Sequence, residues 1–147
     1  IVDLYSEWMV SEFDLTKIAK KTRLQEVLDM CIDYFETEHY VFVHAWIPII
    51  ENCLYYDSDW RKARKQRWDK ARWVNPVEMY RYKIFEPNIK IVFGHWHCSA
   101  FWHEQVPDKY DEFGSKENFE PFITKDIIAL DTCTAHTKKV NVVVLVD

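Results

Sequence analysis

The sequence predicts an α/β fold with a mixed or antiparallel sheet toward its C-terminal end. Apolar residues with helical spacing between positions 24 and 35 are followed by four short runs rich in β-branched and aromatic residues. Hydrophobic residues make up 48% of the 147 residues and aromatic residues 16%, which is enough to fill a core and excludes a disordered chain. The length suits one domain or part of a larger one.

Two helices are expected from the apolar periodicity. The first, over residues 22 to about 37, opens with a Thr-x-x-Gln capping box, and its apolar residues recur every three or four positions. The second is expected over residues 59–72 and is broken by Asn75-Pro76. Both helices would bury one face against the sheet.

Four strands are predicted, and between the second and third lies a polar segment, residues 102–121, that is expected to form a long surface loop. The strands are expected at residues 40–44, 89–93, 127–132 and 140–146. The second ends at Gly94. The last is apolar almost throughout, as a strand covered on both faces would be.

Charge and cysteine usage narrow the classes of function. The formal net charge is −5, but residues 61–72 hold seven basic residues and one Asp, which would attract an anion locally or form the solvated face of a helix. Acidic residues outnumber basic ones elsewhere, which disfavours a nucleic-acid partner. The four cysteines form no CxxC pair and no apolar run reaches the ~18–20 residues of a membrane span, so a cytoplasmic protein with reduced thiols is expected.

The strongest chemical signal is a set of histidines at predicted strand ends. Gly94 allows a sharp turn, and His95 and His97, two positions apart in extended chain, would face one cavity. His44 ends another predicted strand. Three imidazoles at neighbouring strand ends would suit a divalent metal ion, although each alone would be an ordinary hydrogen-bonded histidine.

The chain resembles a known family, the calcineurin-like metallophosphoesterases. Within that family it is most similar to the bacterial protein-phosphatase and diadenosine-tetraphosphatase branch. The resemblance covers residues 40–147 and rests on an ordered series of blocks. The blocks are FVHAWIP (42–48), IVFGHWHCS (91–99), ENFEPFI (117–123), IIALDTCT (127–134) and VNVVVLVD (140–147). The resemblance implies the C-terminal half of a four-layer α/β/β/α sandwich.

The family's activity is hydrolysis of phosphoesters with two divalent metal ions, Mn, Fe or Zn. The resemblance implies that His44 and His95 bind the second metal and that His97 reaches the first. Its substrate would be a phosphorylated protein, a dinucleoside polyphosphate or a small phosphoester.

The family's other metal ligands come from D-x-H, G-D-x-x-D and G-N-H blocks, none of which occurs in the 147 residues. We therefore expect residues 1–147 to form a single partial domain that needs a missing N-terminal half and is inactive alone.

Several further residues acquire expected roles from the same resemblance. Arg72 matches the segment in which relatives carry an arginine that faces phosphate. Asp131 would orient the site or fix a turn, and Trp46 stands where the common pattern has Gly, marking a subgroup or narrowing the entrance. The aromatic residues of segment 101–103 would either wall the substrate cleft or form core under the long loop.

Two alternatives remain at this stage. The first is a non-catalytic, degenerate phosphoesterase-like binding module that keeps a partial metal site. The second, less favoured because of the overall charge, is a nucleic-acid binder that uses the basic block. Residues upstream of Ile1 carrying the absent blocks would distinguish the enzyme from the binding module.

Overall fold

The structure is a computed structural model that describes residues 26–27, 30–50 and 54–146. The chain divides into two compact units, residues 1–32 and residues 33–147, and each is considered by itself. Within the described residues, no helix is both long and apolar enough to cross a membrane.

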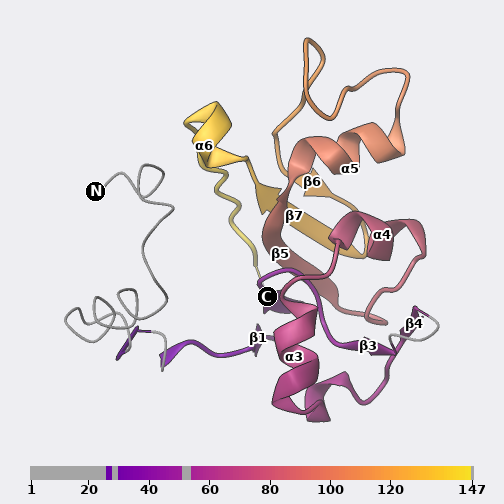
Figure 1. The fold of residues 1–147 in the computed structure, drawn as a ribbon, viewed down its shortest axis with the longest axis vertical. Helices are drawn as coiled ribbons and strands as arrows, with labels where there is room; N and C mark the ends of the chain where they lie inside the picture. Colours follow the sequence, from indigo (N-terminus) through magenta and orange to yellow (C-terminus); the bar gives the residue numbers. More distant parts are fainter. Residues whose placement is uncertain (1–25, 28–29, 51–53, 147) are drawn as a thin grey trace, which may run out of the picture. The chain divides into compact units, whose positions relative to one another are not determined.

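The second unit contains a mixed five-stranded sheet with the strand order β1-β2-β5-β7-β6 (Figure 1). Its strands are β1 (Tyr34–Glu36), β2 (Tyr40–Val43), β5 (Lys90–His97), β7 (Ile127–Asp131) and β6 (Phe122–Ile123). The three central strands β2, β5 and β7 run parallel, and the edge strands β1 and β6 are antiparallel to their neighbours. The predicted α/β class with a mixed sheet is confirmed.

The predicted helix that was to end at about position 37 ends earlier. Val27 and Cys31 retain a helical i,i+4 contact, in which the Cys31 thiol donates to the Val27 carbonyl at 3.3 Å. Tyr34–Glu36 instead forms β1, because these residues pair antiparallel with β2. Positions 22–25 and 28–29 of the predicted helix lie outside the described residues.

The predicted second helix is broken by a short extended link. It consists of a 3-10 turn, η1 (Trp60–Lys62), and the helix α3 (Lys65–Ala71), with extended backbone at Ala63 and Arg64 between them. The Asn75-Pro76 pair begins another helix that the sequence did not predict, α4 (Pro76–Arg81). The Asn75 side chain caps α4 by accepting from the Val77 N–H, and Pro76 occupies its first turn, where no N–H is needed.

The predicted strands at 40–44 and 127–132 are confirmed as β2 and β7. The strand predicted at 89–93 is longer than expected, because β5 passes through Gly94 and reaches His97. The predicted loop starts later than position 102, after the helix α5 (Cys98–Gln105). Small elements not foreseen are β6 and the hairpin of β3 (Ile49–Ile50) and β4 (Tyr55–Tyr56).

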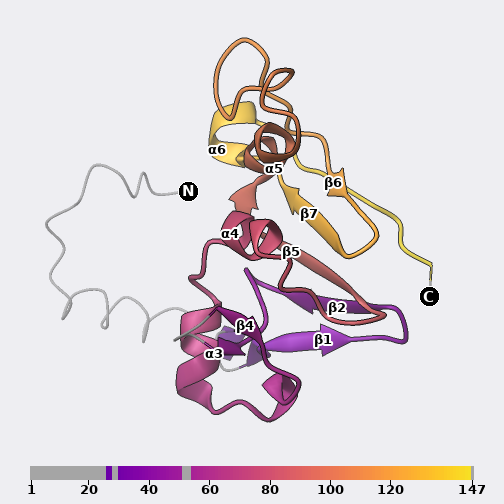
Figure 2. The ribbon, with the colours of Figure 1, turned by 90° about the vertical axis from the view of Figure 1, so that its right-hand side faces the viewer.

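The main core lies between one face of the sheet and the helices (Figure 2). On β1, Tyr34 stacks on Trp68 of α3 and meets Trp60 of η1 edge-on, with ring centroids 5.2 and 5.0 Å apart. Farther along the sheet, Phe101 of α5 packs between Phe93 and Phe122, at 5.5 Å from each. This continuous aromatic packing holds the strand ends in fixed positions.

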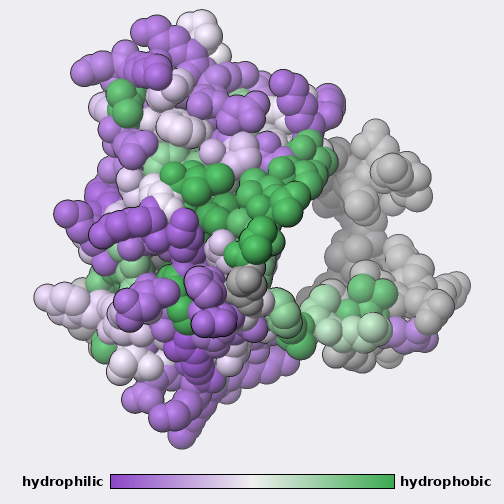
Figure 3. Space-filling model, turned by 180° about the vertical axis from the view of Figure 1, so that it is seen from behind, coloured by the Kyte–Doolittle hydropathy of each residue, from purple (hydrophilic) through white to green (hydrophobic). Residues whose placement is uncertain are grey.

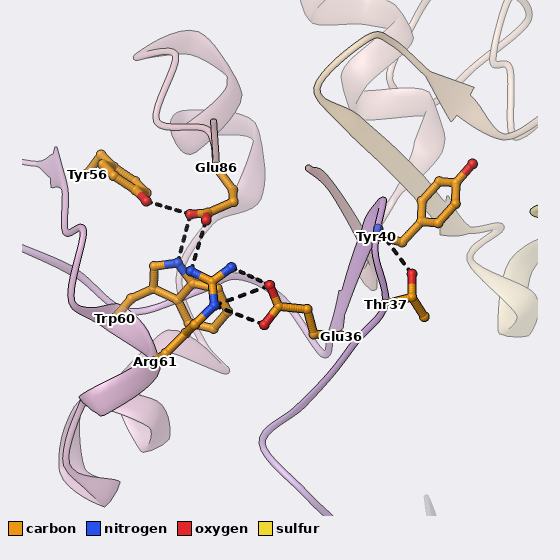
Figure 4. Close-up of polar contacts among 7 residues, drawn as sticks. All are labelled: Glu36, Thr37, Tyr40, Tyr56, Trp60, Arg61 and Glu86. Atoms are coloured by element: carbon orange, nitrogen blue, oxygen red, sulfur yellow. Dashed lines mark hydrogen bonds and ion pairs between the residues drawn. The ribbon is translucent and has the colours of Figure 1, made fainter. Parts of the chain in front are cut away.

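A polar network anchors the lower end of this core (Figure 4). The carboxylate of Glu86, which is only 7% exposed, accepts from the Tyr56 hydroxyl at 2.6 Å, the Trp60 indole at 2.7 Å and the Arg61 guanidinium at 2.9 Å. Arg61 also pairs with Glu36 of β1 through its Nε at 2.9 Å. Burial and the Glu86 carboxylate raise the pKa of Tyr56 to about 12.

The C-terminal segment 140–146 is not a strand, contrary to the prediction. Every second residue is exposed, and the exposed residues are Val140, Val142, Val144 and Val146, at 74–86%. The Tyr40 hydroxyl donates to the Val146 carbonyl, and Figure 2 shows the segment passing the sheet on the side opposite to α4 and α5. Figure 3 shows the apolar surface seen from that side. The apolar run predicts burial on both faces of a strand. In the structure the valines on one side of the segment are exposed, and the residues between them are partly buried.

Candidate metal centre

Two of the predicted histidines meet at the carboxyl ends of adjacent parallel strands. His44 follows β2, and the amide of Gly94 in β5 donates to the His44 carbonyl at 3.1 Å, which extends the pairing of the two strands. The side chains then converge, with His44 Nε2 3.0 Å from His95 Nδ1 and ring centroids 4.7 Å apart. This pair, His44 and His95, is called the histidine pair below.

The sharp turn at this position is taken by His95 and not by Gly94. His95 has φ 63°, in the left-handed region, and a Cβ added at Gly94 would meet nothing within 4 Å. A left-handed histidine costs on the order of 1 kcal/mol, and such strain is typical of functional positions. The β5–β7 register shifts between Phe93 and His97 at the same point, so the strain and the strand irregularity coincide.

The electrostatic environment favours the neutral form of His44. Partial burial lowers the pKa of His44, the neighbouring His95 and Arg72 lower it further, and Asp131 acts in the opposite direction. A neutral imidazole offers a free nitrogen lone pair, the form that binds a metal ion. His44 therefore reaches its metal-binding form at a lower pH than an ordinary histidine.

His97 contacts a different part of the molecule. Its Nε2 lies 2.8 Å from Glu112 Oε1, and its ring packs on Phe113 with centroids 4.6 Å apart. Because His95 is not extended, the alternation that would place His95 and His97 on one side does not apply. Among the described residues, no group of three or more His, Cys, Asp and Glu side chains is placed to hold a metal.

Arg72 lies near the histidine pair but already has partners. Its guanidinium forms ion pairs with Asp33 and with Asp69, the latter at 2.6 Å. Its charge still contributes to the lowered pKa of His44. An anion that approached Arg72 would therefore compete with two carboxylates.

The rest of the basic block is also largely paired. Arg61 contacts two glutamates, Lys62 contacts Asp59 at 2.8 Å and Arg67 contacts Asp57 at 2.5 Å. Each of these pairs places a carboxylate beside a cation, which weakens the attraction of η1 and α3 for a nucleic-acid backbone.

Trp73 completes the surroundings of the histidine pair, and the sequence reasoning did not single it out. Its ring meets His95 edge-on at 5.5 Å and His44 at 6.2 Å, with interplanar angles of 80° and 72°. The side chain is nevertheless 74% exposed. Its position directly after Arg72 is the one signal in the sequence that could have drawn attention to it.

Two other residues with expected roles, Trp46 and Asp131, make structural contacts, and Cys98 is buried. Trp46 is 1% exposed and packs edge-on against Phe93 at 5.1 Å, so it belongs to the core and does not narrow an entrance. The Asp131 carboxylate accepts from the Cys133 N–H at 2.7 Å, which fixes the turn after β7. Cys98 is buried, and burial raises the pKa of its thiol to about 12, so it is not a nucleophile at neutral pH.

The aromatic segment 101–103 lies under the long loop. Phe101 is fully buried, the Trp102 indole donates to the Glu120 carbonyl at 3.0 Å, and His103 Nδ1 contacts the Tyr110 carbonyl at 2.8 Å. Segment 101–103 therefore packs under the long loop and does not line the histidine pair. The candidate site consists of the histidine pair and Trp73.

Comparison with known proteins adds no relative, because no protein-family description, curated protein or solved structure matches this chain.

Proposed function

We propose that the histidine pair is part of the metal centre of a two-metal phosphoesterase of the calcineurin-like kind. The observation that carries the proposal is the 3.0 Å approach of His44 Nε2 to His95 Nδ1 where two parallel strands end. Catalytic groups commonly gather at the carboxyl ends of parallel strands. The backbone strain at His95 and the lowered pKa of His44 support the same site.

The spacing of the two nitrogens fits shared coordination of one ion. Nitrogens bound at ~2.0–2.1 Å stand ~2.8–3.4 Å apart for angles between a right angle and the tetrahedral angle. Imidazole binds Zn and Fe well and distinguishes poorly between such metals, so the pair alone does not choose the metal. Two donors leave an ion incompletely ligated, and in this proposal D-x-H, G-D-x-x-D and G-N-H blocks outside the 147 residues supply the others.

Two divalent ions in such a site would lower the pKa of a water molecule and neutralise the charge of the phosphoryl group. The chain's own contribution is to hold one of them through the histidine pair. In this proposal His97 exchanges Glu112 for the first metal, and Arg72 exchanges one of its carboxylate partners for the substrate phosphate. The substrate in this proposal is a phosphorylated protein, a dinucleoside polyphosphate or a small phosphoester.

The exposed valines of segment 140–146 favour a further layer on that side of the sheet. Four apolar side chains at 74–86% exposure are more than a soluble surface usually presents in one row. A second sheet packed there would bury them and give the four-layer α/β/β/α arrangement, of which this chain would be the C-terminal half.

A second candidate is a non-catalytic binding module with a partial metal site. It is favoured by the engagement of Arg72 with Asp33 and Asp69 and by the contact of His97 with Glu112. In that case the histidine pair binds one ion and no phosphoester is hydrolysed.

The test is turnover of bis-p-nitrophenyl phosphate with added Mn²⁺. The 147-residue chain alone is expected to show none, and the chain joined to a polypeptide that carries the three absent blocks is expected to hydrolyse the ester. His95→Ala should lower that turnover by orders of magnitude. Failure of the joined protein to hydrolyse any phosphoester would favour the binding module, and EDTA-sensitive turnover by the chain alone would contradict the proposed ligand set.

A further inference from the structure

Trp73 is the feature of the site that the proposed metal chemistry does not use. An indole that is 74% exposed forgoes most of the stabilisation that burial of a tryptophan provides. Trp60 and Trp68, by contrast, pack closely against Tyr34 in the core. The exposed indole is therefore accessible to a ligand at the histidine pair.

The ring is held in place although it is exposed. The Trp73 amide donates to the Lys70 carbonyl at 2.9 Å, which ties its backbone to the end of α3. Two edge-on contacts, with His95 at 5.5 Å and His44 at 6.2 Å, orient the indole on the other side. A fixed aromatic ring offers a stacking surface without a large loss of conformational entropy on binding.

We propose that Trp73 stacks on a planar aromatic ring that a phosphate ligand carries directly on its ester oxygen. This rests on the proposed function, because the histidine pair and Arg72 would position the phosphate. The indole centroid lies 5.5 Å from the His95 ring and 6.2 Å from the His44 ring. A ring bonded to the oxygen of a phosphate held at these histidines would therefore lie beside the indole. Trp73 is thus a specificity-determining residue that favours aryl phosphates over alkyl phosphates.

The decisive comparison is phenyl phosphate against cyclohexyl phosphate, which have rings of the same size, one planar and one puckered. Dissociation constants are measured by ligand-observed NMR with micromolar protein and saturating Zn²⁺. The wild-type chain is expected to bind phenyl phosphate about 2- to 12-fold more tightly, the range for one aromatic pair. Trp73→Ala should abolish this preference and Trp73→Phe should restore part of it.

Two further variants separate the failure of this inference from that of the proposed function. Tyr55→Ala removes another aromatic residue that is 67% exposed, away from the histidine pair, and should leave the preference unchanged. His95→Ala should weaken both phosphates equally. Equal affinity of the wild-type chain for the two phosphates, or a preference that survives Trp73→Ala, overturns the stacking role and leaves the metal proposal standing. Binding of neither phosphate overturns the stacking role, whereas the metal proposal is decided separately by turnover of the joined protein.

Phosphotyrosine and AMP distinguish where the aromatic ring sits in the ligand. In phosphotyrosine the ring is attached to the phosphate oxygen, whereas in AMP a ribose separates them. A Trp73-dependent preference for phosphotyrosine supports the inference. A Trp73-dependent preference for AMP would overturn the placement of the ring directly beside the phosphate.

Discussion

Removal of the Arg61 side chain tests whether the network around Glu86 holds the scaffold of the site (Figure 4). Arg61 links three elements, because it pairs with Glu36 of β1 and with Glu86 before β5, and its guanidinium lies 4.2 Å from the centre of the Trp60 ring. In Arg61→Ala, the Glu86 carboxylate keeps the Tyr56 and Trp60 donors but loses its cation.

The expected loss follows from the burial of the two partners. Breaking a fully buried ion pair costs ~3–5 kcal/mol, and a hydrogen bond to a charged group contributes ~1.5–3 kcal/mol. Glu86 is 7% exposed but Arg61 is 34% exposed, so solvent screens part of the interaction. We therefore expect the free energy of unfolding to fall by about 2–3 kcal/mol.

Urea unfolding followed by tryptophan fluorescence measures this loss as a lower midpoint at an unchanged m value. Lys62→Ala is the matched control, because its ion pair with Asp59 is 83% exposed on the lysine side and its removal should leave the midpoint unchanged. In a Glu86→Gln background, Arg61→Ala should cost less, since the buried group is then neutral. Equal effects of Arg61→Ala and Lys62→Ala would refute the reasoning.

Three further predictions follow from charge and exposure. Arg72→Ala removes a cation that lowers the pKa of His44, so the pH midpoint of metal binding should move upward in a pH-dependent metal titration. The pKa of Tyr56 is about 12 in the folded chain and 10 when unfolded, so stability should be lost between pH 10 and 12 by on the order of 1 kcal/mol, and Tyr56→Phe should lose less over that range. The exposed valines of segment 140–146 should make the chain self-associate, and Val144→Lys should reduce this self-association in sedimentation, because Val144 is 86% exposed.

The sequence predicted correctly those elements in which the local residue pattern agrees with the tertiary pairing. The strands at 40–44 and 127–132 are short, β-branched and lie between other strands, so local pattern and tertiary pairing agree. Residues 34–36 continued a helical pattern but pair with β2, which no local signal reveals. Segment 140–146 is an apolar run, and such a run does not reveal whether other parts of the protein pack on one or on both of its sides. In the structure one side is exposed to solvent.

The candidate site was predictable only in part for a related reason. His44 and His95 meet because their strands are parallel neighbours, which the strand-end pattern suggested. The partners of Arg72 and the contact of His97 with Glu112 depend on loops and on the left-handed backbone of His95. Periodicity carries no information on such backbone irregularities. It also does not reveal that Trp73, which follows α3, comes to lie beside His44 and His95.

The central claim is that His44 and His95 together bind a divalent ion. The direct measurement is Zn²⁺ binding by the 147-residue chain in competition with a chromophoric chelator. We predict saturable binding of one ion that is lost in His44→Ala and in His95→Ala but retained in His39→Ala, since His39 lies at the opposite end of β2. No saturable binding, or binding that survives both substitutions in the histidine pair, would contradict the claim.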